Sequence, residues 1–168
     1  MTINYFRESE KYRPKKIEKL LVGEAPPSSG KTYFYVPKPM SENISIRKDR
    51  SLPATIFYHY FQTRPTTVDK YIDLLLLLKK KGIFLVDICD DPIKVRGNPE
   101  GEQRIIDEIP NLRKKLISRK IEIADEEIIF LLARTSYSNH VRAEFPNSKL
   151  IRWIDFRMNP EPCNNNSD

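Results

Sequence analysis

Residues 19–27 read KLLVGEAPP, an apolar run that ends in a glycine and is followed by an acid, an alanine and two prolines. Such a run, with no polar alternation, predicts a strand over Lys19 to Gly23 that is covered on both faces. Residues 83–89 (IFLVDIC) and 128–133 (IIFLLA) have the same character, and residues 150–156 (LIRWIDF) give a fourth strand. Three strands this apolar indicate a mainly parallel sheet with helices on both sides.

Helical patterns separate these strands. One helix with aromatic residues is expected from Leu52 to Phe61, and a longer one runs from residue 66 through five leucines and three lysines to Gly82, which stops it. Two further helical pieces, Glu102 to Ile109 and Pro110 to Lys120, are broken at the proline. The order of elements predicts the α/β fold class: a three-layer α/β/α sandwich with a mainly parallel four-stranded sheet.

The chain has 168 residues, which predicts a single domain over residues 1–168. Residues 1–16 read as an irregular lead-in and residues 159–168 as a frayed tail. The longest apolar helical run is far shorter than the roughly 20 residues of a membrane span, and no signal peptide is visible. With two cysteines and no disulfide framework, we expect a cytoplasmic location and no membrane partner, while the oligomeric state stays open.

The net charge of +6 is unevenly spread, because residues 1–65 hold 12 Lys and Arg against 6 Asp and Glu, whereas the rest of the chain is balanced. A local basic surface favours a polyanionic partner such as nucleic acid, although it also serves solubility. We expect weak, salt-dependent binding, to DNA more than to RNA. The expected contacts to the nucleic-acid backbone are Ser28, Ser29, Lys31, Lys38, Arg47, Lys48 and Arg50.

Residues 25–32 (APPSSGKT) match a relaxed P-loop pattern in which alanine replaces the first glycine. A P-loop aims successive backbone N–H groups at phosphates and continues directly into a helix. Two prolines in the loop remove two of these donors, and Pro37 and Pro39 would break the helix. Because residues 83–87 resemble a Walker B strand, a P-loop NTPase stays an alternative function.

The same stretch carries a second pattern. Gly23-Glu24-Ala25-Pro26-Pro27, followed by Phe34-Tyr35, resembles the first motif of the uracil-DNA glycosylase superfamily, and is closest to the branch that reads Gly-Glu-Ala-Pro-Gly. The resemblance implies a parallel α/β/α fold in which Glu24 helps to place the attacking water. It also implies that Phe34 or Tyr35 stacks on an extracted base. The base-binding set it implies is Gly23, Ala25, Pro26, Phe34, Tyr35 and Asp87.

The rest of the resemblance concerns the ends of the later strands. Asp87 stands where the superfamily commonly has an Asn that reads the base edge, and Asn159-Pro160 stands in place of its second motif, which makes Asn159 a second catalytic candidate beside Glu24. An ionised Asp has no donor to offer, so we expect little or no excision of uracil. The iron–sulfur cluster of the similar branch needs four cysteines, so no cofactor is expected here.

These observations leave three hypotheses. The first is a uracil-DNA glycosylase-like protein that excises or binds a damaged or deaminated base, and whether it is an enzyme stays open. The second is a non-catalytic member of the same fold that binds a nucleotide or another protein, and the third is the NTPase. Structural roles compete with each assignment: Glu24 as a carboxylate bound by loop N–H groups, the aromatic rings as core, and Asp87 with its acidic neighbours as a turn rather than a metal site.

Overall fold

The computed structural model describes residues 2–45, 48–132 and 135–162. Its centre is one four-stranded sheet, in which all neighbouring strands are parallel and the order is β2-β1-β3-β4. The strands are β1 (Lys19–Gly23), β2 (Ile83–Asp87), β3 (Ile128–Leu132) and β4 (Lys149–Arg152). Every residue of β3 is buried, as are all but one residue of β1 and of β2, so the prediction of strands covered on both faces is confirmed.

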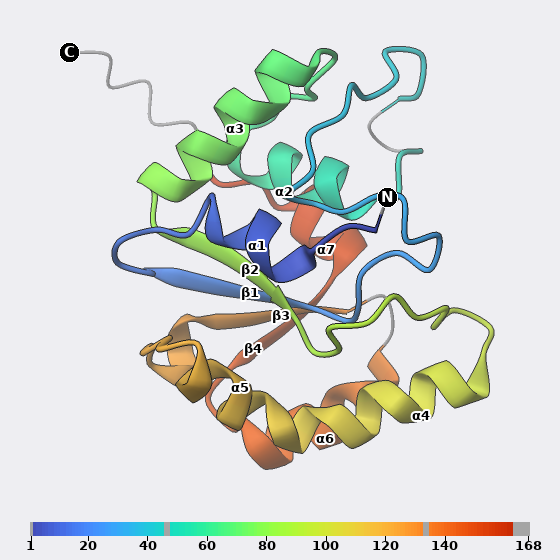
Figure 1. The fold of residues 1–168 in the computed structure, drawn as a ribbon, viewed down its shortest axis with the longest axis vertical. Helices are drawn as coiled ribbons and strands as arrows, with labels where there is room; N and C mark the ends of the chain where they lie inside the picture. The colour runs from blue at the N-terminus through green and yellow to red at the C-terminus, as the bar shows by residue number, and fades with distance from the viewer. Residues whose placement is uncertain (1, 46–47, 133–134, 163–168) are drawn as a thin grey trace.

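Helices lie on both sides of this sheet, which makes the molecule an α/β sandwich (Figure 1). One layer contains α2 (Leu52–Phe61), α3 (Val68–Lys80) and α7 (Trp153–Met158). The other contains α4 (Pro99–Glu108), α5 (Leu112–Ser118) and α6 (Ser138–Glu144). Short 3-10 turns occupy Ile109–Asn111, Asp125–Glu127 and Thr135–Tyr137, the first of which contains Pro110 and produces the predicted break between two helices.

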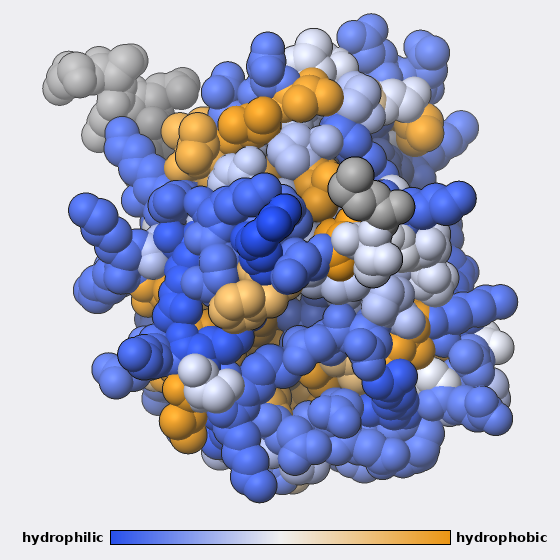
Figure 2. Space-filling view, in the orientation of Figure 1, coloured by the Kyte–Doolittle hydropathy of each residue, from blue (hydrophilic) through white to orange (hydrophobic). Residues whose placement is uncertain are grey.

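The caps of α2 and α3 explain why these two helices begin where the sequence predicts. The Ser51 hydroxyl accepts a hydrogen bond from the Ala54 N–H, and the Thr67 hydroxyl accepts one from the Lys70 N–H. After α3, Gly82 takes a left-handed φ of +76°, which turns the chain into β2. Figure 2 shows an apolar strip over α3, where Val68, Leu76 and Leu77 are exposed.

The prediction of a fourth strand over residues 150–156 is wrong in its second half. The strand ends at Arg152, and α7 begins at Trp153. The Trp153 indole donates to the Leu131 carbonyl, while Phe156 stacks on the His59 ring of α2 at a centroid distance of 3.6 Å. Inward-facing side chains three residues apart fit a helix and not a strand, and this spacing is what the apolar run concealed.

The lead-in expected to be irregular contains a helix, α1 (Tyr5–Glu10). The Asn4 side chain caps it by accepting from the Arg7 N–H at 2.9 Å. Of the predicted frayed tail, Asn159 closes α7 through its N–H to the Asp155 carbonyl, and residues 163–168 lie outside the described residues. Within the part of the chain that the structure describes, no helix has the length and apolar composition needed to cross a bilayer.

Residues 24–51 form the long connection between β1 and α2, and polar contacts in its middle and near its end hold it to the domain. The Tyr35 hydroxyl accepts from the Leu85 N–H at 2.7 Å, and the Tyr71 hydroxyl donates to the Phe34 carbonyl at 2.6 Å. Farther along, Arg64 donates to the Ser41 carbonyl and pairs with Asp49 at 2.7 Å. The connection is therefore anchored at more than one point along its course.

Candidate functional site

A pocket of about 330 Å³ opens beyond the carboxyl ends of β1 and β2. In a parallel sheet these ends meet at one edge, and Gly23 of β1 is in register with Asp87 of β2. Glu24, Phe34 and Asp87 all line the pocket, together with Lys38 and Trp153. With Ala25 and Pro26 also in the lining, the structure brings together six of the predicted site residues, which lie up to 63 positions apart in the sequence.

Gly23 permits the close packing at the base of this pocket. A Cβ atom at this position would lie 2.6 Å from Oδ1 of Asp87, closer than non-bonded atoms approach. Beyond the strand, the Ile88 N–H donates to the Gly23 carbonyl and the Cys89 N–H to the Glu24 carbonyl, both at 2.9 Å. Backbone pairing therefore continues past the sheet and fixes where Glu24 leaves it.

Asp87 is partly buried, and Lys115 of α5 holds the end of its strand. The Lys115 ammonium donates to the carbonyls of Asp87 and Ile88 and to the carboxylate of Asp90, each at 2.8 Å. Burial raises the pKa of Asp87 from 3.8 to about 7; Lys115 opposes this rise, and repulsion from Asp90 and Glu24 adds to it. A large fraction of Asp87 is consequently protonated at neutral pH.

This protonation changes what Asp87 can recognise. The expectation that uracil is excluded assumed a carboxylate without a donor. A neutral carboxyl group has one O–H donor and one carbonyl acceptor, which is the same pair that an amide side chain presents to a base edge. The raised pKa that produces this donor comes from burial of Asp87 at the end of β2, and the residue type alone does not reveal it.

The two predicted stacking rings have different places. Phe34 lines the pocket, and its ring lies 5.5 Å from Phe57 between centroids. Tyr35 is not among the lining residues; it is buried, and its hydroxyl is bound to the backbone of Leu85. The core-packing interpretation fits Tyr35. Phe34 is also buried, with 5% of its surface exposed, and it is the ring of the two that lines the pocket. Tyr33, which sequence reasoning did not select, also lines the pocket.

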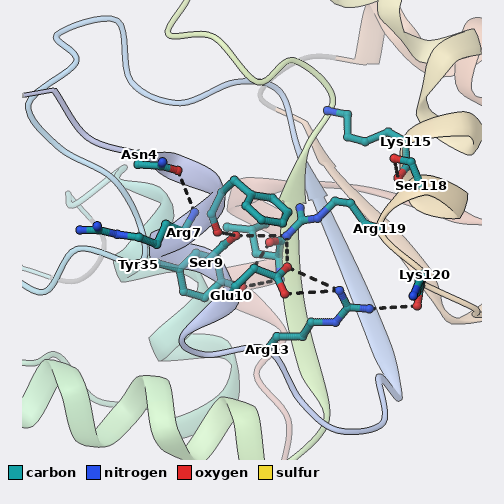
Figure 3. Close-up of polar contacts among 12 residues, drawn as sticks. Asn4, Arg7, Ser9, Glu10, Arg13, Tyr35, Lys115, Ser118, Arg119 and Lys120 are labelled. Atoms are coloured by element: carbon teal, nitrogen blue, oxygen red, sulfur yellow. Dashed lines mark hydrogen bonds and ion pairs between the residues drawn. The ribbon is translucent and has the colours of Figure 1, made fainter.

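A larger cavity of about 760 Å³ adjoins this pocket, and Pro26, Tyr33 and Asp87 line both. The N-terminal segment with α1 forms the outer wall of this cavity. Arg119, which directly follows α5, connects α5 to α1 (Figure 3). Arg119 donates to Glu10 at 2.6 Å and to Ser9 at 3.2 Å, and its guanidinium lies over the Phe6 ring. No local sequence pattern indicates this wall, because its contacts join residues about 110 positions apart.

The predicted backbone contacts that the structure describes lie on the connection between β1 and α2. Lys38 lines the pocket, while Lys48 and Arg50 are exposed on the connection before α2. Ser28, Ser29 and Lys31 belong to an exposed turn in which the Gly30 N–H donates to the Pro27 carbonyl. Arg47 lies outside the described residues. Of these described positions, Lys38 alone belongs to the lining of the pocket.

The P-loop alternative lacks its characteristic geometry. The described residues that follow the turn, 31–45, contain no helix, and the next helix begins at Leu52. A helix that starts at the phosphate site supplies both the N–H groups and the dipole of a P-loop. The turn at residues 27–30 therefore differs from that motif in the way the prolines predict.

The structure does not bring Asn159 to the pocket. Asn159 is exposed at the far end of α7, about 9 Å along the helix axis from Trp153, which lines the pocket. Its side chain donates to the Asp155 carbonyl at 2.8 Å, and the following Glu161 N–H donates to the His59 carbonyl at the end of α2. The helix that replaces the second half of the expected strand carries Asn159 away from Glu24.

The remaining polar candidates have structural roles. Cys89 is buried, and burial raises the pKa of its thiol to about 11, so it stays protonated at neutral pH. The His59 Nδ1–H donates to the Phe156 carbonyl at 2.7 Å, and burial lowers the pKa of the His59 ring. Among the described residues, no group of three or more His, Cys, Asp or Glu side chains has the arrangement of a metal site.

The pocket thus combines the Glu24 carboxylate, a readily protonated carboxyl at Asp87, the ring of Phe34 and the ammonium group of Lys38. Such a set can bind a planar polar molecule, exchange a proton with it and hold a water molecule. No family model matches the chain, and neither a curated protein nor a solved structure shows significant similarity to it.

Proposed function

We propose that this protein is a uracil-DNA glycosylase-like enzyme that binds a base extracted from nucleic acid and hydrolyses its N-glycosidic bond. The observation that carries the proposal is the meeting of Glu24, Phe34 and Asp87 in one pocket at the carboxyl edge of a parallel sheet. A volume of about 330 Å³ is at the lower end of ligand pockets and suits one base rather than a duplex. Extraction of the base from its stack follows from that size.

In the proposed reaction, the bond between the sugar and the base breaks with its electron pair leaving on the base. Water attacks the resulting oxocarbenium-like carbon, and Glu24 positions this water and accepts its proton. The negative charge of the Glu24 carboxylate also stabilises the sugar cation. Protonated Asp87 donates a hydrogen bond to the departing base, whose face lies on Phe34. The base anion then takes up one proton through solvent while Glu24 releases the proton it accepted, so the products are the free base and an abasic sugar that carries the water oxygen.

The test is base excision from oligonucleotides that contain uracil, hypoxanthine or xanthine, measured at pH 6 and pH 8 under saturating enzyme. Bases that present an N–H donor beside a carbonyl match the protonated form of Asp87. With a pKa of about 7, this form becomes about tenfold scarcer over that interval, so the rate of excision is expected to fall by about tenfold. Binding without excision of any base would instead support the non-catalytic alternative.

A second prediction concerns Lys38, which lines the pocket, and Lys48, which is exposed on the same connection. If Lys38 and Lys48 each neutralise one phosphate of a single strand, replacing both with Ala lowers the slope of log affinity against log salt by about 1.4. Fluorescence anisotropy of a labelled oligonucleotide at several salt concentrations measures this slope. Lys114→Ala is the control, because Lys114 is exposed on α5 in the opposite layer. An equal slope for the double variant and the wild type would contradict the assigned contacts.

A further inference from the structure

Five lysines line a hollow of about 350 Å³ at the opposite edge of the sheet from the candidate site. They are Lys15, Lys16, Lys79, Lys80 and Lys81, and Glu18 and Gly82 complete the lining. We call these seven residues the lysine hollow. It lies where β1 and β2 begin, and five strand residues separate it from Glu24 and Asp87, which is about 16 Å. The hollow is therefore separate from the proposed base pocket.

The backbone joins the two lysine-bearing segments. The N–H groups of Glu18 and Lys19 both donate to the Gly82 carbonyl, at 2.7 and 3.2 Å. Gly82 is required for this approach, because a Cβ atom there would lie 2.6 Å from Cγ of Glu18 and 3.0 Å from the Lys16 carbonyl oxygen. The lysines at the end of α3 and those before β1 are thus held beside each other by the fold.

The hollow contains more positive charge than its own acidic residue can neutralise. Glu18 pairs with Lys16 at 3.0 Å, and the Lys79 ammonium donates to a neutral acceptor, the Lys11 carbonyl. No hydrogen bond or ion pair joins the side chains of Lys15, Lys80 or Lys81 to another described residue. The helix dipole of α3 supplies only about half a negative charge at this end. An excess of several positive charges remains.

Three lysines outside the hollow pair with acids. Lys11 pairs with Glu8 at 2.5 Å and Lys115 with Asp90 at 2.8 Å, and Lys19, which follows the hollow in the sequence, pairs with Glu127. Figure 2 shows hydrophilic surface where α3 ends and the chain turns into β2. Crowding of like charges destabilises a folded protein unless an anion neutralises them.

We propose that the lysine hollow binds a chain of adjacent phosphate groups. Lysine ammonium groups act as flexible point charges that suit phosphate without demanding a fixed geometry. The lining contains neither an aromatic ring for a base nor an apolar side chain for an acyl chain. Recognition is therefore of phosphates alone, whether in the backbone of a nucleic acid or in a free polyphosphate, and it does not depend on the function proposed for the base pocket.

Calorimetric titration with inorganic tripolyphosphate at low salt tests the proposal. Replacing both Lys80 and Lys81 with Glu is expected to weaken binding by at least tenfold, since two attractive charges become repulsive. The control replaces Lys70 and Lys114 with Glu, which changes the net charge equally at two exposed positions outside the hollow. Binding within about twofold of the wild type is expected there.

Two further measurements identify the source of the phosphates and complete the test. Displacement of a single-stranded oligonucleotide by tripolyphosphate from the wild type, but not from the hollow variant, supports the nucleic-acid backbone as the ligand. Tripolyphosphate binding without such displacement supports a free polyphosphate. An equal loss of tripolyphosphate binding in the hollow and control variants, or no binding by the wild type, overturns the proposal. Binding only to anionic lipid vesicles overturns it as well.

Discussion

Replacing Glu24 with Gln should lower the rate of base excision by about 10²–10⁴-fold, the usual cost of losing a general base or a key charge. Gln preserves the shape of the side chain but accepts no proton and carries no charge to stabilise the sugar cation. Because the backbone pairing at Glu24 is unaffected, the protein should stay folded, and any change in the free energy of unfolding is measured separately. The effect is therefore expected in the chemical step.

Single-turnover excision under saturating enzyme measures that step, and urea denaturation measures stability. Glu126→Gln is the matched control, because Glu126 is an exposed acid in the 3-10 turn before β3 and lines neither the base pocket nor the lysine hollow. The control is expected to excise bases at the wild-type rate. Excision by Glu24→Gln at that same rate would remove Glu24 from the reaction, and with it the proposed mechanism.

Replacing Asp87 with Asn should stabilise the protein at pH 8 and have little effect at pH 4. Asp87 has a pKa of about 7 in the folded state against 3.8 when exposed, so the folded state binds more protons between these values. The free energy of unfolding therefore falls as pH rises through this interval. The full difference between the two pKa values corresponds to a loss of at most about 4 kcal/mol in the free energy of unfolding. Because the carboxyl group of Asp87 is only partly buried, we expect a loss of about 1–3 kcal/mol.

Urea denaturation at pH 4.5, 6 and 8 measures the free energy of unfolding of the wild type and of Asp87→Asn. The stability advantage of Asp87→Asn over the wild type is expected to grow with pH. Asp91→Asn is the control, because Asp91 is a nearby carboxylate with a largely exposed side chain, paired with Arg104. Its effect on stability is expected to be small and nearly constant over the same range. A constant difference for Asp87→Asn would show that its carboxyl group ionises normally.

Much of the fold follows from local pattern. Buried parallel strands are apolar along their whole length, and β1 and β3 were predicted to within a residue, while β2 ends two residues before the predicted limit. An apolar run also predicted a strand over residues 150–156, but its second half is helix α7, whose apolar side chains pack on α2. Helix α1 has only six residues, and the contacts of Arg119 that hold it come from the distant end of α5.

The candidate site was predictable to the extent that it lies at strand ends. The positions of Glu24 and Asp87 follow from parallel topology, since equivalent ends of neighbouring strands meet. The choice between Phe34 and Tyr35 required the structure, because it depends on which ring bonds to the backbone of β2. The raised pKa of Asp87 depends on burial and on charges from α5 and two loops, none of which is local in sequence.

The short helix α1 makes one wall of the larger cavity depend on its anchor. A six-residue helix is unstable by itself, so α1 keeps its form through docking, chiefly the contacts of Arg119 with Ser9 and Glu10. Segments of this kind open by local unfolding while the remaining core stays intact. One wall of the cavity beside Asp87 can therefore separate from the domain. The size of the largest molecule that the cavity can admit then depends on the free energy of releasing α1, and not only on the volume of the cavity while α1 is docked.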